Sequence, residues 1–284
     1  MIKSVKVFMV NDNLKSQIID YVIARRCKGG GFCFYRLEEP CGADTFYGLS
    51  LLKRLIGHFS DNASALYLKN MQQADGGYQS IFHAYYSIKS LEMLDNTPDY
   101  DPTSYIKDHI AIDRVEFLPA GIPSIFRRLY ILVDLICLLD ISLDAEHHTK
   151  LIHFIMDHKI LDGGFGYPDA SLIETSQALI TLNKLHHPIS DSGLVTFFEA
   201  CEDPVSGFIN SPGTSMSYLE YIHAGLVVAN SLKRKPKYSE RCLLTIMDCQ
   251  NRTGGFSRLP SGGIATLEYT WIAVNALDIL GVIE

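Results

Sequence analysis

Acidic residues stand near the start of four apolar, helix-like segments: Asp44, Glu174, Glu220 and Glu268. Such carboxylates commonly accept hydrogen bonds from free amide groups and offset the positive end of a helix. A sharper interpretation is that Glu174 and Glu220, which lie in adjacent segments, share a metal ion or a proton. With Ser176 they would offer oxygen ligands, which suit Mg²⁺ better than Zn²⁺. We therefore predict Glu174 and Glu220 as catalytic groups, with His223 as an acid or base.

Aromatic side chains crowd the same segments. Those that we predict to contact a ligand are Phe46, Tyr47, Tyr86, Tyr130, Tyr221 and Trp271. Aromatic rings line apolar cavities and attract positive charge, although some of these rings must be plain core. Arg127, near the start of its segment, is predicted to bind an anionic part of the ligand, together with helix N-termini. Arg36, Arg128 and Arg258 are further candidates for this anion site, against the commoner role of arginine as a surface residue.

These segments belong to an internal repeat. Glycine–aromatic turns occur at Gly30-Gly31-Phe32, Gly76-Gly77-Tyr78, Gly163-Gly164-Phe165, Gly207-Phe208 and Gly254-Gly255-Phe256. The glycine just before the aromatic residue recurs at intervals of 46, 87, 43 and 48 residues. Because one interval is about twice the others, we expect a degenerate sixth turn near Ala120-Gly121-Ile122.

Each unit of the repeat has the same internal order. A helix with one polar face is stopped by the turn, because glycine takes the left-handed conformation that a helix end favours. After a loop comes a second helix that is apolar nearly all round, which indicates burial. Six such hairpins predict an all-α fold, an α/α toroid with inner and outer helix rings, in one domain over residues 1–284. An open superhelix of the TPR or HEAT type is the alternative, since its repeats have similar lengths.

Composition narrows the class of function. The chain is 47% hydrophobic with a formal net charge of −7, which allows a large core and argues against nucleic acid as a partner. Its most apolar run, residues 129–141, is too short to span a bilayer and carries two aspartates. The first residues lack the apolar length of a signal peptide. We therefore expect a soluble, cytoplasmic protein without a membrane span.

Three stretches resemble the β-subunits of protein prenyltransferases, the farnesyl- and geranylgeranyltransferases. CGADTFYGLSLL (41–52) is similar to HGGYTFCGLAAL of that family, and GGFGYPDASLIETSQ (163–177) has the spacing of its GGFQGR..K.VD.CYS. GFINSPGTSMSYLEY (207–221) is similar to GLLDKPGKSRDFYHT. The resemblance covers residues 12–282, with the three loops in the right order. Terpene cyclases have related glycine–aromatic turns.

The resemblance implies a toroid whose central cavity binds an isoprenoid diphosphate or another apolar small molecule, and a helical-repeat protein as partner subunit. In that family, zinc is held by an aspartate, a cysteine and a histidine, and the matching positions here are Glu174, Ser176 and Glu220. The positions that match the family's diphosphate-binding residues are Cys41, Pro168, Ser171 and Gln177. We therefore expect a divergent prenyltransferase-like protein, in which alkyl transfer would use carboxylates instead of the usual zinc site.

Two other classes of function stay open. One is a non-catalytic binding or scaffold toroid, which the absent zinc and diphosphate residues favour. The other is a lyase of the terpenoid cyclase type. Such cyclases protonate an alkene with a DxDD motif, whereas Asp99-Tyr100-Asp101 is followed by proline and threonine. A central cavity filled by side chains would favour the scaffold, and an open, aromatic-lined cavity with Glu174 and Glu220 at its mouth would favour an enzyme.

Overall fold

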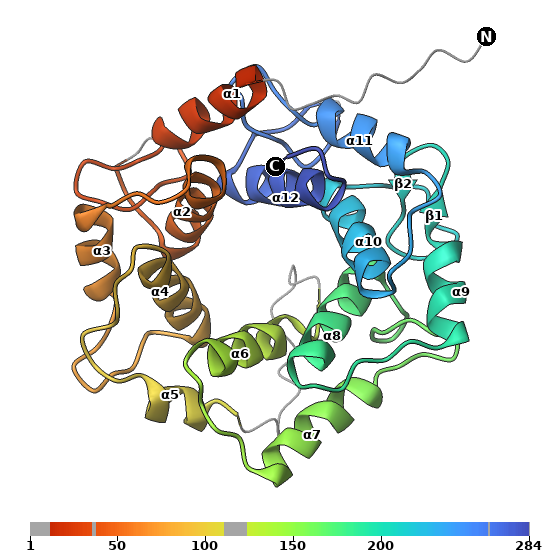
Figure 1. Cartoon of the computed structure of the whole chain (residues 1–284), viewed down its shortest axis with the longest axis horizontal. Helices are drawn as coiled ribbons and strands as arrows, with labels where there is room; N and C mark the ends of the chain where they lie inside the picture. Colours follow the sequence, from red (N-terminus) through yellow and green to blue (C-terminus); the bar gives the residue numbers. More distant parts are fainter. Residues whose placement is uncertain (1–11, 36–37, 111–123, 261, 284) are drawn as a thin grey trace.

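The computed structural model describes residues 12–35, 38–110, 124–260 and 262–283. The helices of the chain are arranged in two concentric rings (Figure 1). The inner ring consists of α2 (Gly42–Ile56), α4 (Ile81–Met93), α6 (Arg127–Leu138), α8 (Leu172–Lys184), α10 (Leu219–Ser231) and α12 (Leu267–Ile279). The outer ring consists of α1 (Asp12–Ile23), α3 (Asn62–Lys69), α5 (Thr103–Asp108), α7 (Ala145–Met156), α9 (Ser192–Ala200) and α11 (Ser239–Asp248). Between α9 and α10, two short strands pair antiparallel: β1 (Glu202–Asp203) and β2 (Gly207–Phe208).

The chain closes on itself. Each inner helix packs against the inner helices of the neighbouring units, and α12 packs against α2. Figure 1 shows the inner helices arranged around a common centre. The predicted all-α toroid of six hairpins is therefore confirmed, and the open superhelix is wrong. The turn expected near Ala120-Gly121-Ile122 and the candidate Arg36 lie outside the described residues. No described helix is long and apolar enough to cross a membrane.

The turn glycines lie where the backbone of one unit contacts the next outer helix, and we call these contacts the seams between units. Gly30, Gly163 and Gly254 have φ angles of 97°, 102° and 89°, which favour glycine. A Cβ atom on Gly163 would lie 2.0 Å from the backbone of Gly193, at the start of the next outer helix. On Gly254 it would lie 2.2 Å from the carbonyl oxygen of Gln17 in α1. Because Gly254 belongs to the last unit and Gln17 to the first, this contact closes the ring.

The aromatic residue of the turn is tied to the inner helix of its own unit. Phe32, Phe165 and Phe256 are fully buried. Burial of one such ring contributes about 1.5–3 kcal/mol by removing apolar surface from water. The backbone N–H groups of these residues donate to threonine hydroxyls, each at 3.0 Å: Thr45 in α2, Thr175 in α8 and Thr270 in α12. Ring burial and one side-chain hydrogen bond therefore hold the hairpin in the same way in three units.

The inner helices also begin and end in a repeated way. Ser80, Ser171 and Thr266 precede α4, α8 and α12, and each accepts a hydrogen bond from the backbone N–H three residues later. After the helices come six residues with positive φ: Gly57, Asp95, Asp140, His186, Lys233 and Gly281. After every inner helix except α2, the N–H of the residue that follows the left-handed one reaches back to a free carbonyl, as Arg234 N does to Ala229 O at 2.9 Å. Local capping therefore sets both ends of α4, α8 and α12.

Candidate ligand-binding site

A cavity of about 400 Å³ lies at the centre of the ring, between the N-terminal halves of all six inner helices. It brings together most of the predicted site residues: Phe46, Tyr47, Tyr86, Arg127, Tyr130, Ser176, Glu220, His223 and Trp271. Further lining residues are Tyr85, Gln177, Arg258, Glu268 and Tyr269, and aliphatic side chains complete the wall. Two predicted site residues, Glu174 and Tyr221, are not among the residues that line it.

One side of the cavity is an aromatic wall, formed by Phe46, Tyr47, Tyr85, Tyr86 and Trp271 from α2, α4 and α12. The ring centroids of Phe46 and Tyr86 are 5.6 Å apart, and those of Tyr47 and Trp271 are 5.5 Å apart. The rings meet at tilted angles, an arrangement that aromatic quadrupoles favour over flat stacking. This wall presents apolar surface and π-faces to any molecule in the cavity.

A polar network links four inner helices along the same part of the wall. The hydroxyl of Tyr47 donates to Glu268 Oε1 at 3.1 Å. Arg127 Nη2 lies 3.4 Å from the hydroxyl of Tyr86 and 4.0 Å from Glu268 Oε1. Burial, and then the charge of Glu268, raises the pKa of Tyr47 well above its usual range, so Tyr47 keeps its proton and donates. The negative charge of Glu268 partly offsets the positive charge of Arg127 before any ligand binds.

The opposite side carries what we call the acceptor wall: Gln177 of α8 and Glu220 of α10. Arg258 binds Glu220 through two nitrogens, Nε at 2.6 Å and Nη2 at 2.5 Å, and both contact the same oxygen, Oε1. The guanidinium carbon of Arg258 lies 3.9 Å from the ring centroid of Tyr218. Glu220 Oε2 and Gln177 Oε1 are buried, and neither has a hydrogen-bond partner among the described residues.

His223 follows Glu220 by three residues and also lines the cavity. Its ring centroid is 6.1 Å from that of Trp271. Burial lowers the pKa of His223 to about 4, because the enclosed site disfavours the charged imidazolium. At neutral pH this histidine is therefore uncharged, with one ring nitrogen able to accept a hydrogen bond and the other able to donate one.

Glu174 serves its own helix instead of the cavity. Its backbone N–H donates to Ser171 Oγ at 3.2 Å, and the hydroxyl of Ser171 donates to Glu174 Oε2 at 3.1 Å. The backbone N–H of Ile125 donates to Oε1 at 3.3 Å. Burial raises the pKa of Glu174 despite these donors. The commoner role that the sequence suggested for such acids, helix capping, is thus the role that this geometry supports for Glu174.

A one-residue difference in position separates the capping acids from the cavity acids. Asp44 and Glu174 are the third residues of α2 and α8, and each contacts the residue before its helix. Glu220 and Glu268 are the second residues of α10 and α12, and both line the cavity. One residue rotates a side chain by roughly 100° around a helix. Sequence patterns do not fix a helix start to a single residue, so they could not separate the two pairs.

The positions that match the family's zinc ligands do not fit a zinc ion. Glu174 is engaged as a cap, Ser176 Oγ donates to Ile173 O at 2.8 Å, and Glu220 is paired with Arg258. Zinc prefers thiolate and imidazole ligands, whereas this set holds an alcohol and two carboxylates. Within the described ranges, no three His, Cys, Asp or Glu residues gather in a way that could hold a metal ion. The predicted Mg²⁺ or proton shared by Glu174 and Glu220 gains no support from this geometry.

Sequence reasoning missed an ion cluster one helical turn further along the inner helices. Asp134 of α6 is buried and pairs with Lys184 Nζ at 2.8 Å and with Lys89 Nζ at 3.3 Å. Lys89 follows Tyr85 by four residues, and Asp134 follows Tyr130 by four. Residues four apart lie on one helix face, so the cavity-facing tyrosines could have indicated these two positions.

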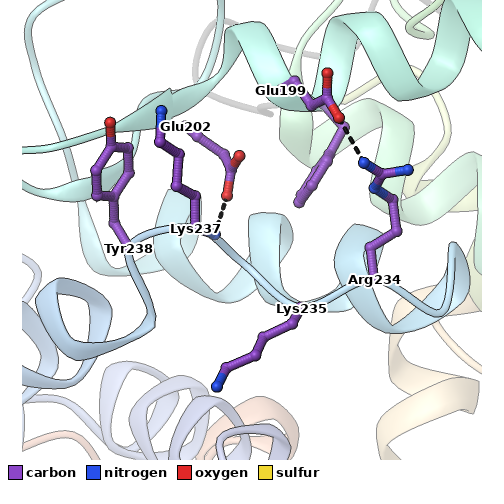
Figure 2. Close-up of a pocket in the computed structure, with 7 residues that line it drawn as sticks. Glu199, Glu202, Arg234, Lys235, Lys237 and Tyr238 are labelled. Atoms are coloured by element: carbon purple, nitrogen blue, oxygen red, sulfur yellow. Dashed lines mark hydrogen bonds and ion pairs between the residues drawn. The ribbon is translucent and has the colours of Figure 1, made fainter.

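A second pocket, of about 310 Å³, lies on the outer ring between the end of α9 and the loop that joins α10 to α11 (Figure 2). Its charged groups are largely paired. Arg234 Nη2 bonds Glu199 Oε1 at 2.6 Å, and the backbone N–H of Lys237 donates to Glu202 Oε1. Figure 2 shows Lys235 pointing away from these pairs. The sequence did not predict this pocket, and its paired charges make it a weaker ligand site than the central cavity.

Comparison with known proteins agrees with this architecture. The family model described as "Prenyltransferase alpha-alpha toroid domain" matches residues 1–85 and 123–284. A solved structure of Candida albicans protein geranylgeranyltransferase-I complexed with GGPP is similar with a TM-score of 0.60 and 16% sequence identity. The match covers 84% of this chain and 83% of that chain, and at this identity it shows the fold alone. No curated protein matches the chain. The predicted resemblance to a prenyltransferase β-subunit-like toroid is confirmed.

Proposed function

This chain belongs to the prenyltransferase alpha-alpha toroid family, and from that premise we propose that its central cavity binds an isoprenoid or a similar apolar chain. The aromatic wall carries the proposal, because its five rings from three helices border one cavity that the protein's own side chains do not fill. A volume of about 400 Å³ falls within the range of roughly 300–1,000 Å³ for small-molecule sites. The GGPP in the Candida albicans structure supports an isoprenoid as the class of ligand.

A cavity that the protein's own side chains do not fill also favours ligand binding over a scaffold role. Apolar side chains that face this cavity stay in contact with water and forgo the free energy of burial. A scaffold gains nothing from that loss, and natural cores are packed with few voids larger than a water molecule. An apolar ligand buries this surface, so the cavity makes physical sense as a binding site.

Alkyl transfer stays a separate prediction. Of the two carboxylates predicted for it, Glu220 lines the cavity and Glu174 caps α8, which supports Glu220 over Glu174 as the proposed catalytic carboxylate. His223, uncharged at neutral pH, is a second group at the wall that could accept a proton. The helical-repeat partner subunit that the resemblance implies likewise stays a prediction.

Trp271 offers a direct test, because it is the only tryptophan of the chain and it lines the cavity. We would titrate the protein with farnesyl and geranylgeranyl compounds, as alcohols and as diphosphates, and follow tryptophan fluorescence. The proposal expects saturable quenching or a spectral shift at micromolar ligand for at least one compound. Absence of binding by every compound, checked by calorimetry, would contradict it.

A cavity-filling variant separates binding in the cavity from adsorption to the surface. Val227 of α10 lines the cavity, so Val227→Phe should abolish or strongly weaken binding while far-ultraviolet circular dichroism stays unchanged. Val205 is 69% exposed in the turn between β1 and β2, and Val205→Phe is the matched control that should bind normally. Equal binding by both variants would place the ligand outside the cavity.

A further inference from the structure

We propose that the face of the ring around the cavity mouth rests on an uncharged lipid surface, from which the apolar ligand enters the cavity. The entry of the ligand rests on the proposed function, whereas the contact with lipid does not depend on it. Three features of the described residues support the proposal: the position of the mouth, the exposed apolar side chains beside it, and the distribution of charge between the two ends of the ring.

The cavity opens at the end of the ring where the inner helices begin. Its lining includes Glu268 from the first turn of α12 and Arg258 from the loop before that helix. The side chains of Glu268 and Arg258 are 43% and 46% exposed, so solvent reaches this end of the cavity. Five of the inner helices are entered through a described loop that follows the aromatic residue of the turn. The described parts of these loops, which we call the mouth loops, are 33–35 with 38–41, 79–80, 166–171, 209–218, and 257–260 with 262–266.

The mouth loops expose large apolar side chains. Among the described residues, six such side chains lie in the mouth loops, whereas the loops that leave the inner helices expose one, Tyr100. The six are between 40% and 61% exposed: Phe34, Tyr35, Tyr167, Met216, Leu259 and Ile264. A single exposed apolar residue is ordinary, but a group of them on one face of a protein indicates a contact surface.

Three neighbouring mouth loops are joined to one another, so part of this apolar surface is continuous. Ser211 Oγ donates to Ala170 O at 2.8 Å, which joins loop 209–218 to loop 166–171. The backbone N–H of Leu219, directly after loop 209–218, donates to Arg258 O at 3.1 Å and so joins the last loop to them. The joined loops carry four of the six exposed side chains: Tyr167, Met216, Leu259 and Ile264.

The two ends of the ring differ in charge. Loop 209–218 holds no charged residue, and the described mouth loops together carry charge at Glu38, Glu39, Asp169 and Arg258, of which Arg258 is paired with Glu220. The loops that leave the inner helices are rich in charge: loop 94–102 holds three aspartates, and loop 232–238 holds three lysines and an arginine. Because a charge loses hydration free energy where it meets lipid, the end with few charges is the end that suits a lipid surface.

The composition of the mouth loops also selects the kind of surface. Anionic lipids attract clusters of lysine and arginine, whereas the described mouth loops hold three carboxylates and one paired arginine. A surface without net charge therefore fits better. Aliphatic and aromatic side chains on exposed loops can enter its head-group region and bury their surface there. A protein partner, by contrast, is commonly steered and aligned by complementary charge, of which these loops offer little.

A mouth at a lipid surface also gives the ligand a route. An isoprenoid dissolves in lipid, and transfer of its apolar surface through water costs free energy. With the mouth loops in the head-group region, the chain can pass from the lipid to the aromatic wall without that cost.

Flotation of the whole chain with phosphatidylcholine vesicles tests the contact with lipid. Wild type should float with the vesicles. The combined variant Met216→Ser, Leu259→Ser and Ile264→Ser, called the mouth variant, should lower the partition coefficient about a hundredfold, since each partly buried side chain contributes roughly fivefold. The matched control combines Ile56→Ser, Leu66→Ser and Leu244→Ser, three exposed apolar positions outside the mouth loops, and should float as wild type does. Circular dichroism checks that both variants are folded.

The entry of ligand is measured as the transfer of farnesol from the vesicles to the protein, followed by the fluorescence of Trp271 in the cavity. The mouth variant should take up farnesol from vesicles about tenfold more slowly than wild type, because less of it is bound to the lipid. Its affinity for farnesol offered without vesicles should be unchanged, since none of the three substituted residues lines the cavity. Equal transfer rates in wild type and mouth variant overturn the entry from lipid.

The contact with lipid is overturned if wild type does not float, or if the mouth variant floats as well as wild type. Flotation with anionic phosphatidylserine vesicles alone also overturns it, because charge and not apolar contact would then drive binding. Wild type that stays in solution and self-associates in sedimentation, while the mouth variant does not, shows that the mouth loops contact protein instead. Failure to bind farnesol without vesicles contradicts the proposed function and the entry of ligand, and flotation of wild type would still support the contact with lipid.

Discussion

At the seams between units the toroid uses one contact several times, whereas the residues that line its cavity change in type around the ring. Gly30, Gly163 and Gly254 each meet the backbone of the next outer helix with the same left-handed conformation. Around the cavity, the equivalent helix faces carry aromatic rings in α2 and α4, an arginine in α6, a glutamine in α8 and glutamates in α10 and α12. The comparison teaches that the repeated residues build the ring and that the unrepeated ones define what it binds.

The largest expected loss of stability comes from a substitution that disrupts a seam between units. In Gly254→Ala the added Cβ would lie 2.2 Å from Gln17 O at a φ of 89°, and both partners are backbone, so neither can move cheaply. We expect a loss of about 3 kcal/mol in the free energy of unfolding, from backbone strain and overpacking together. Urea denaturation followed by circular dichroism measures it.

Gly213→Ala is the matched control for the seam. Gly213 has a φ of 80°, but an added Cβ would meet nothing within 4 Å. Only the conformational cost of about 1–2 kcal/mol should remain. Equal losses in the two variants would mean that the contact between the last and first units does not stabilise the ring.

The second-largest expected loss of stability concerns the ion cluster of Asp134, which occurs in one place in the inner ring and is not part of the repeat. Asp134→Asn removes the charge that Lys89 and Lys184 share, and leaves two ammonium groups facing each other. We expect a loss of about 2 kcal/mol, less than for a fully buried pair because both lysines are partly exposed. The control is Asp140→Asn, at an exposed position whose left-handed backbone asparagine tolerates, and it should change stability little.

Asp134 also gives a pH dependence. Burial raises the pKa of this carboxyl, but the hydrogen bond from Lys184 and the charge of Lys89 outweigh burial, so the pKa lies below its usual value. Because the folded pKa is below the unfolded one, the stabilisation is present above about pH 4 and is lost as the pH falls through the folded pKa. Asp134→Asn should lack this part of the acid sensitivity.

A third, smaller effect on stability concerns a repeated feature, the residue with positive φ that follows each inner helix. Lys233 has a φ of 54° and is the second residue after α10, at the position where α12 is followed by Gly281. Lys233→Gly should stabilise the fold by about 1 kcal/mol, since glycine adopts this conformation without steric cost. Lys235→Gly, two residues later at an exposed position without positive φ, should not stabilise it. Thermal unfolding of the two variants would show whether the cap is strained as the backbone angle indicates.

The smallest effect distinguishes a capping acid from a paired one. Burial raises the pKa of Glu174, so folding favours its protonated form. The sign is opposite to that of Asp134: this stabilisation is present at low pH and is lost as the pH rises through the folded pKa. Relative to Glu174→Gln, the wild type should therefore become more stable as the pH falls from 7 to 4.5. A stability difference that does not vary with pH would show that folding leaves the pKa of Glu174 unchanged, which contradicts the raised pKa.

Much of the ring could be predicted from the sequence, because its residues obey local rules. The Gly-Gly-Phe turn at 254–256 predicts a helix end and a buried ring, and both are observed. The apolar second helices predicted the inner layer, and the predicted rings of Phe46, Tyr47 and Trp271 do meet at the cavity. Tyr221 was predicted with them, but its ring packs on Tyr218 and does not line the cavity. Periodicity alone could not decide on which side of its helix that ring lies.

The sequence by itself determined the repeat, the helix order and the aromatic character of the inner helices, since glycine conformation, capping and apolar periodicity act over a few residues. The tertiary structure alone decided which acids face the cavity. Glu174 and Glu220 look alike in the sequence, yet one caps α8 and the other faces inward beside Arg258, a residue 38 positions further along the chain. The physical reason is that a partner distant in sequence and a rotation of one residue about a helix axis are settled only when the ring closes.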